Sequence, residues 1–200
     1  MILVSGFQAF RGEKINPTEK LINELELMKK QSPDFGDFST VVLPVTFAEA
    51  PRVLKNAIDK FKPKKVLMLG QAGGTKKIGL ERVALNWQEA RFPDENNYLP
   101  LPSRINESGV DAYFSNVDIG RLKQQLDVLH IPVEISFSAG AFVCNRIYYE
   151  FFQHCGPEAS GLFVHFPFLD EQLVQNPGAE SLSWEVQKQA FLAILKFFKN

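Results

Sequence analysis

Cys144 is the first residue whose surroundings suggest chemistry. It follows the small-residue turn Ser138-Ala139-Gly140, where a strand is expected to end and a helix to begin. Unpaired amide groups and the positive end of the helix dipole favour a thiolate at such a position, especially beside a protonated histidine. Cys144 is therefore a candidate nucleophile, with a small buried hydrophobic residue as the alternative. Cys155, late in the same predicted helix, has no such setting.

A thiolate nucleophile needs a base, and the chain has three histidines. His130 and His154 stand near predicted helix ends, where exposed side chains interacting with the dipole are expected. His165 differs, because Phe163-Val164 and Phe166-Pro167-Phe168 surround it with apolar residues at a strand end. It is the candidate base, and a hydrogen-bonded core histidine is the alternative. We expect no metal site, since no second His or Cys stands at ligand spacing.

Glu81 is the candidate for the group that orients the imidazole. It interrupts the apolar run from Ile78 to Leu85. The alternative is a solvent-facing strand residue paired with Arg82. The nearby turn 70–74 is rich in glycine but lacks the Lys-Ser/Thr ending of a phosphate loop, so its glycines are expected to let the backbone approach a small ligand.

The elements that must position these residues alternate along the chain. Turn residues and apolar periodicity predict strands that alternate with amphipathic helices. This order predicts an α/β fold, a three-layer sandwich of a mostly parallel twisted sheet with helices on both faces. Reactive groups then gather at the carboxyl ends of the strands, and the polar segment 86–108 is an excursion near the site, with a possible hairpin. Strands are expected at 2–5, 40–44, 65–69, 78–85, 133–137 and 162–165, and helices from Asn16-Pro17, at 47–60, 119–129 and 140–154, and after Ser183.

Composition excludes several classes of function. The 200 residues predict one domain, 1–200, and a net charge of −1 with mixed signs predicts neither a nucleic-acid partner nor an acidic tail. No stretch approaches the length of a membrane span, and the first apolar run is too short for a signal peptide. Cys144 and Cys155 would lie about 16 Å apart on one helix, too far for a disulfide. We therefore expect a cytoplasmic protein.

With these pieces assembled, the sequence resembles the pyroglutamyl peptidase type I family, also called pyrrolidone-carboxylate peptidases. The resemblance runs nearly end to end and rests on four motifs in the same order. They read SGFQAFRG with NPT at 5–12 and 16–18, GQAGGTKKIGLERVALN at 70–86, SFSAGAFVCNRIYY at 136–149, and FVHFPF at 163–168.

The resemblance implies a cysteine exopeptidase that removes an N-terminal pyroglutamyl residue from peptides. Its Cys-His-Glu triad falls on Cys144, His165 and Glu81. Residues implied in substrate binding are Phe7, Phe10, Gln71, Arg91, Phe142 and Val143, with Gln71 near the lactam and Arg91 near the oxyanion. The family also implies a cytosolic homotetramer, with no metal or organic cofactor.

The chain departs from the family pattern at several positions near the expected pocket. Ala9 and Arg11 replace a usual proline and glycine, and Thr75 replaces a common arginine. The amino-acid sequence of residues 88–101 also differs from the usual pattern. Two other functions therefore stay open. One is a cysteine amidohydrolase with altered substrate preference, and the other is a non-catalytic homologue that binds lactam-ended peptides.

Overall fold

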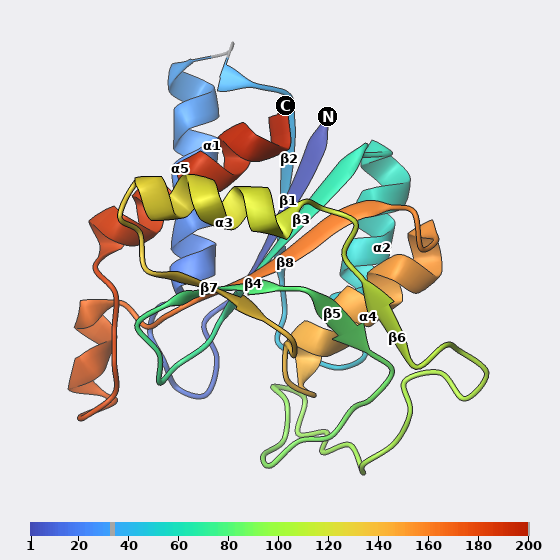
Figure 1. Cartoon of the computed structure of the whole chain (residues 1–200). Helices are drawn as coiled ribbons and strands as arrows, with labels where there is room; N and C mark the ends of the chain where they lie inside the picture. The colour runs from blue at the N-terminus through green and yellow to red at the C-terminus, as the bar shows by residue number, and fades with distance from the viewer. Residues whose placement is uncertain (33–34, 200) are drawn as a thin grey trace.

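A six-stranded β-sheet forms the centre of the computed structural model, which describes residues 1–32 and 35–199 (Figure 1). Across the sheet the strands are, in order, β2 (Phe38–Leu43), β1 (Ile2–Phe7), β3 (Lys65–Gln71), β8 (Ser160–Phe166), β4 (Ile78–Glu81) and β7 (Val133–Ser136). All neighbours run parallel except β4 and β8. The predicted mostly parallel sheet is confirmed, while the antiparallel pair was not predicted.

Helices cover both faces of this sheet, as predicted. One apolar cluster joins the sheet to α1 (Pro17–Gln31), α3 (Ile119–Val128) and α5 (Trp184–Lys199). A second cluster joins the opposite face to α2 (Glu49–Phe61) and α4 (Val143–Cys155). Successive strand residues contribute to opposite clusters: Leu3 belongs to the second and Val4 to the first. Burial on both faces explains why the strands read as continuous apolar runs.

The starts of α1 and α4 differ in how their amide groups are satisfied. At α1 the Asn16 side chain accepts from the Thr18 amide at 2.9 Å and Pro17 follows the cap, as predicted. Helix α4 begins at Val143, later than the predicted Gly140. Gly140 has a φ of 77°, so the chain is still turning there. No side chain caps α4, which leaves its first amide groups available to a ligand.

The predicted strand 78–85 is two strands that belong to different sheets. It breaks at Arg82, whose amide donates to Ser136 at 2.8 Å and whose carbonyl accepts from Ser115 at 2.9 Å. The second half, β5 (Val83–Leu85), pairs antiparallel with β6 (Ala112–Phe114) in a two-stranded sheet. This break lets β4 end at Glu81 inside the main sheet.

The segment 86–111, which includes the predicted excursion 86–108, forms the long loops at the bottom of Figure 1. Instead of a hairpin of strands it contains one isolated antiparallel bridge, Gln88 to Ser103. Buried Asp94 anchors the segment, since its carboxylate accepts from the Phe47 amide at 2.8 Å and the Tyr98 amide at 2.9 Å. The loop is thereby held against the start of α2, beside the candidate site.

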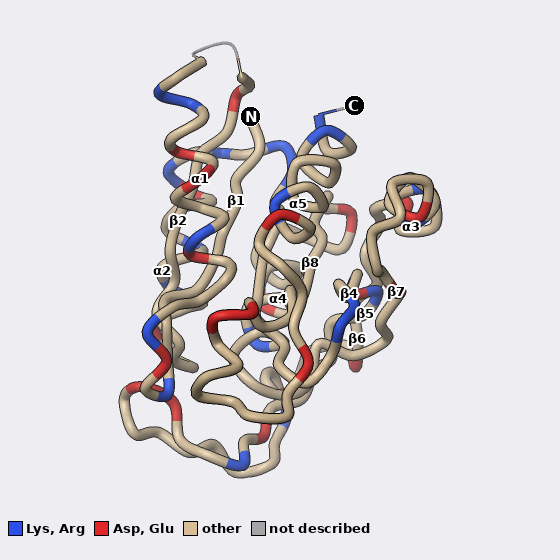
Figure 2. The backbone as a smooth tube through the Cα atoms, turned by 90° about the vertical axis from the view of Figure 1, so that its left-hand side faces the viewer, with Lys and Arg blue, Asp and Glu red and all other residues tan. Residues whose placement is uncertain are grey.

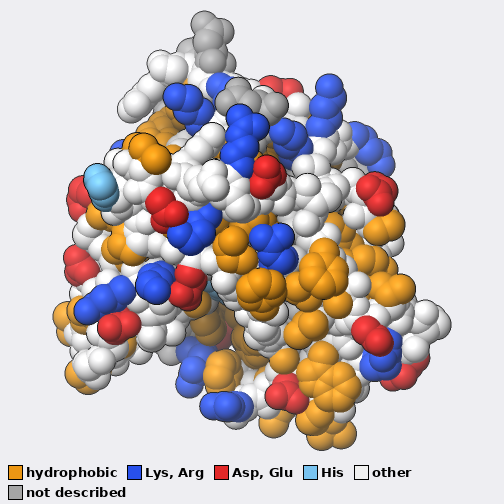
Figure 3. Space-filling view, viewed as in Figure 1, with side chains coloured by type: hydrophobic (Ala, Val, Ile, Leu, Met, Phe, Trp, Pro, Cys, Tyr) orange, Lys and Arg blue, Asp and Glu red, His pale blue; other side chains and the backbone are white. Residues whose placement is uncertain are grey.

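Charges of both signs are dispersed over the molecule. Lys and Arg intersperse with Asp and Glu along the backbone in Figure 2 and on the face shown in Figure 3, in keeping with the net charge of −1. In the described part of the chain, no helix has both the length and the apolar character needed to cross a membrane.

Candidate active site

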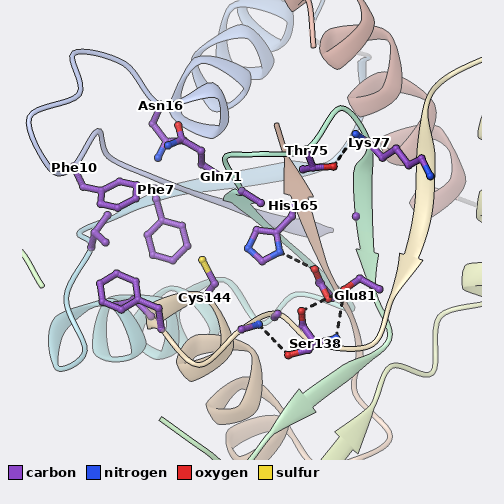
Figure 4. Close-up of a pocket in the computed structure, with 18 of the residues that line it drawn as sticks. Phe7, Phe10, Asn16, Gln71, Thr75, Lys77, Glu81, Ser138, Cys144 and His165 are labelled. Carbon is purple, nitrogen blue, oxygen red and sulfur yellow. Dashed lines mark hydrogen bonds and ion pairs between the residues drawn. The ribbon is translucent and has the colours of Figure 1, made fainter. Parts of the chain in front are cut away.

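A cavity of about 410 Å³ opens at the carboxyl ends of β1, β3 and β8, where the start of α4 meets the sheet (Figure 4). Eight of the nine residues predicted from the sequence line it: Phe7, Phe10, Gln71, Glu81, Phe142, Val143, Cys144 and His165. They come from four separate parts of the chain. The fold therefore assembles nearly the whole predicted set around one space.

Cys144 is the second residue of α4, and its sulfur points toward the middle of the cavity (Figure 4). The side chain is half-buried and forms no disulfide. It packs against the end of β3, where a Cβ added to Gly70 would lie 3.1 Å from the sulfur and 2.6 Å from the Phe163 ring. Glycine at position 70 thus permits the close approach of Cys144 to the sheet.

His165 and Glu81 form a buried pair beside Cys144. The Nδ1 atom of His165 lies 2.7 Å from the Glu81 Oε1 atom. Glu81 is only 2% exposed, which excludes the alternative of a solvent-facing residue paired with Arg82. The second carboxylate oxygen of Glu81 has no partner among the described residues. The carboxylate thus directs its charge at one partner, the imidazole.

This arrangement favours a protonated imidazole. Burial alone lowers the pKa of His165, but hydrogen bonds and charge interactions with Cys144 and Glu81 outweigh it and raise the pKa to about 10. A histidinium held between a carboxylate and a thiol stabilises the thiolate. The geometry therefore supplies what a cysteine nucleophile requires.

The start of α4 supplies donors for a developing negative charge. The turn 138–142 brings the chain to the helix, and the Ala141 carbonyl accepts from the Glu89 amide at 3.1 Å rather than joining the helix. The first amides of α4, from Val143 onward, have no capping side chain and carry the positive end of the dipole. Cys144 therefore lies among donors suited to an oxyanion.

Aromatic side chains enclose one end of the cavity, to the left in Figure 4. Phe7 and Phe10 come from the end of β1 and the loop after it, and Phe142 precedes the nucleophile by two residues. Phe92 from the excursion also lines this end, and its ring centroid lies 5.1 Å from that of Phe142. Such an end suits a small, flat, apolar-faced group.

Phe92 was not predicted from the sequence, and Arg91 is placed differently from its prediction. Arg91 is exposed and is not among the residues that line the cavity. Its neighbours explain this, because Ala90 and Phe92 both turn inward and leave Arg91 on the outer side. The signal that could have identified Phe92 is an aromatic residue in a polar segment, although Trp87 and Tyr98 in the same segment share it. Arg11, one of the departures from the family pattern, stacks its guanidinium 3.8 Å from the centre of the Phe92 ring.

The opposite end of the cavity is polar. Thr75, Lys77, Glu134, Ser136 and Ser138 line it. Lys77 and Glu134 lie 3.5 Å apart with both side chains about half exposed, so their attraction is weak. Gly79 pairs with His165 across β4 and β8 and with Glu134 across β4 and β7. A Cβ at this position would lie 3.3 Å from the Glu81 Oε1 atom and 3.5 Å from the His165 Cβ atom, so glycine avoids crowding the buried pair.

The other two histidines lie away from the cavity, as predicted. His130 and His154 are both exposed, and His154 contacts Asp59 at 3.2 Å. Among the described residues, no cluster of three or more His, Cys, Asp or Glu side chains is arranged to hold a metal ion.

Comparison with known proteins gives one consistent result. The sequence model of the family described as pyroglutamyl peptidase matches residues 1–197. A curated pyrrolidone-carboxylate peptidase from Yersinia pestis is 38% identical over 188 residues, which cover 91% of this chain and 85% of that one.

Solved structures are similar over almost their whole length. The pyrrolidone carboxyl peptidase of Fervidobacterium islandicum superimposes with a TM-score of 0.89 at 33% identity and covers 99% of this chain and 97% of its own. The pyroglutamyl peptidase I of Bacillus amyloliquefaciens gives a TM-score of 0.88 at 32% identity, with coverage of 100% and 97%.

Proposed function

The chain belongs to the pyroglutamyl peptidase family, as a cysteine peptidase of the pyroglutamyl peptidase I type, and from this premise we propose that Cys144, His165 and Glu81 together hydrolyse the amide bond after an N-terminal pyroglutamyl residue. The observation that carries this proposal is the 2.7 Å contact between His165 and Glu81 in the cavity that Cys144 enters. Nucleophile, base and orienting carboxylate thus stand in the order that acyl transfer through a thiol needs.

The first step forms a thioester. His165 holds the proton of Cys144, and the thiolate attacks the carbonyl carbon of the pyroglutamyl residue. Glu81 accepts from Nδ1, so the other ring nitrogen, Nε2, is directed at the sulfur and the leaving group. The carbonyl oxygen becomes an oxyanion, which accepts hydrogen bonds from the amides at the start of α4.

Collapse of this intermediate breaks the C–N bond. His165 gives its proton to the departing amine, and the shortened peptide leaves with a free amino terminus. Water then adds to the thioester with His165 as the base, which releases pyroglutamate and restores Cys144. Every proton moves between Cys144, His165, the amine and water, so this chemistry needs no cofactor.

Selectivity follows from the two ends of the cavity. The lactam is flat and uncharged, so Phe7, Phe10 and Phe142 can cover its faces while Gln71 pairs with its edge. A charged amino terminus would lose its water there without gaining a partner, which is costly. The peptide beyond the lactam then extends past His165 to the polar end. This arrangement supports exopeptidase action.

Turnover of matched amides tests the proposal against its two rivals. The purified protein is incubated with a fluorogenic pyroglutamyl amide, the corresponding prolyl amide and an acyclic acyl amide. We expect turnover of the pyroglutamyl compound only. Equal turnover of the acyclic amide would support the amidohydrolase, and binding without turnover would support the lactam-binding homologue.

The cellular location and the oligomeric state of the protein are inferred from its relatives. Relatives named pyrrolidone-carboxylate peptidases match nearly the whole chain, and on that resemblance we propose a cytoplasmic homo-oligomer, a tetramer. Gel filtration with light scattering tests the assembly, and a monomer at working concentration would contradict it.

A further inference from the structure

Gln172 is a buried amide that connects three segments around the aromatic end of the cavity without lining it. It lies in the short 3-10 helix η2 (Asp170–Val174) and is 2% exposed. Its Nε2 atom donates to Gln71 at 3.0 Å and lies 3.3 Å from the Ile15 carbonyl and 3.4 Å from a Glu13 carboxylate oxygen. These contacts join η2 to the end of β3 and to the loop after β1.

The surroundings of Gln172 allow only one orientation of its amide. The Leu169 backbone amide donates to its Oε1 atom at 3.0 Å, while all its nitrogen contacts are acceptors. A reversed amide would set its oxygen against a carboxylate and two carbonyl oxygens, and its nitrogen against a donor. Asn176 keeps Glu13 in place by donating to its other oxygen at 2.6 Å.

That orientation determines which end of the Gln71 side-chain amide is left without a partner. The oxygen of Gln71 is occupied by the donor from Gln172. Its amino group has no acceptor among the residues that the structure describes, and Gln71 lines both the active-site cavity and a smaller cavity beside Glu13. The amino group is therefore free to donate a hydrogen bond to a group that enters the aromatic end.

We propose that Gln172 is a positioning residue for substrate recognition: it orients Gln71 so that the site selects a ring with a hydrogen-bond acceptor on its edge. The lactam carbonyl of pyroglutamate is such an acceptor. The saturated ring of proline carries no acceptor there. The inference rests on the proposed function for its substrate, but it concerns recognition and not the catalytic step.

Kinetic constants for two Gln172 variants test this role. Gln172→Leu removes the donor, and Gln172→Glu keeps an acceptor for the Leu169 amide but cannot donate to Gln71. Loss of one oriented hydrogen bond predicts about a tenfold rise in KM for a pyroglutamyl amide. We expect kcat to stay within about twofold, because the catalytic groups do not contact Gln172. An unchanged KM in Gln172→Leu would overturn the inference.

Two further variants separate positioning from general stability. Asn176→Leu removes a contact of the same region with Glu13 but leaves Gln71 and Gln172 paired, so its KM is expected to stay within about twofold of the wild type. In a double-mutant cycle, Gln172→Leu should add nothing to the effect of Gln71→Leu. Additive effects, or an Asn176→Leu variant with an equal rise in KM, would show a merely structural role.

A readout that needs no turnover separates this inference from the proposed function. In a Cys155→Ser background, iodoacetamide labels Cys144, and 2-pyrrolidone should protect it. We expect about tenfold more 2-pyrrolidone for the same protection in Gln172→Leu, with an unchanged labelling rate in its absence. Equal protection in both proteins would overturn the inference. Failure of the wild type to cleave pyroglutamyl amides would instead reject the proposed function.

Discussion

The catalytic end of the cavity, which consists of Cys144, His165 and Glu81, is built from regular elements of the main sheet and α4. Loops supply much of the aromatic end. Glu81 ends β4, His165 lies in β8, and Cys144 is in the first turn of α4. Phe10 and Phe92, by contrast, lie in the loop after β1 and in the excursion. Neither of these rings is held by main-sheet pairing, and each packs on other side chains.

Because of this difference, we expect the aromatic end to tolerate sequence change better than the catalytic end. The catalytic geometry is set by strand register, since Gly79 pairs with His165 and Glu81 lies opposite Phe163. A shift there would move several groups at once. At the aromatic end, one side chain can change and leave the rest in place. The departures at Ala9 and Arg11 lie at this tolerant end, while the three catalytic side chains are all present.

Apart from loss of the nucleophile itself, the largest effect is expected at the catalytic end, from Glu81→Gln. The amide keeps the size of the carboxylate but removes the charge that supports the imidazolium, so kcat should fall on the order of 10³-fold. Steady-state kinetics with a pyroglutamyl amide measure it. Glu134→Gln is the matched control, since Glu134 lines the same cavity on the next strand but has no contact with His165. A similar loss in both variants would contradict a specific role for Glu81.

The pH dependence should follow the raised pKa of His165. Because folding raises this pKa from 6.5 to about 10, protonation of His165 stabilises the folded state. That contribution is complete below pH 6.5 and is lost as the pH rises through about 10. Above pH 10, kcat/KM should fall about tenfold per unit, because the proton for the leaving amine is gone.

Glu81→Gln is expected to move both effects to lower pH, since one of the groups that raises the pKa has lost its charge. Urea unfolding and kcat/KM measured between pH 6 and 11 test this shift. A basic limb with the same midpoint in both proteins would assign the titration to another group.

A smaller effect is expected at the aromatic end, from Phe92→Ala. Losing one wall of the pocket should raise KM about tenfold, with kcat little changed, because the ring lines the aromatic end and lies away from the proposed catalytic groups. Tyr98→Ala on the same excursion is the control, since Tyr98 packs on Phe47 outside the cavity. An equal rise in KM for both would mean that the whole loop, rather than one ring, shapes the pocket.

The smallest effect should come from Arg91→Ala. The side chain is exposed and outside the cavity, so kcat and KM are expected to stay within about twofold of the wild type. Loss of kcat by a factor of ten or more would show that the excursion closes over the substrate and brings Arg91 to the oxyanion.

Much of the fold and of the catalytic end could be predicted because the signals are local. Asn16-Pro17 marks a helix start, and alternating strands and helices indicate a parallel sheet. An acidic residue that interrupts an apolar run marked Glu81 as a candidate, although the same pattern also fitted a solvent-facing residue paired with Arg82. Motifs shared with a known family then placed Cys144 and His165 in one site.

The features missed from the sequence depend on contacts between distant segments. The antiparallel pairing of β4 with β8 and the break at Arg82 follow from hydrogen bonds to Ser115 and Ser136, which no periodicity reveals. Phe92 lines the cavity because the excursion brings its ring against Phe142 and Arg11, which are distant in the sequence. Gln172 lies in a short 3-10 helix, and only the folded chain brings it to Gln71.

The most direct test of the central claim compares the two cysteines. The kcat/KM for a pyroglutamyl amide is measured for the wild type, Cys144→Ser and Cys155→Ser. Serine keeps the shape of the side chain but is not ionised beside His165, so Cys144→Ser should lose at least about 10³-fold, while exposed Cys155 should be replaceable without loss. Turnover retained by Cys144→Ser, or lost equally in both variants, would contradict Cys144 as the nucleophile.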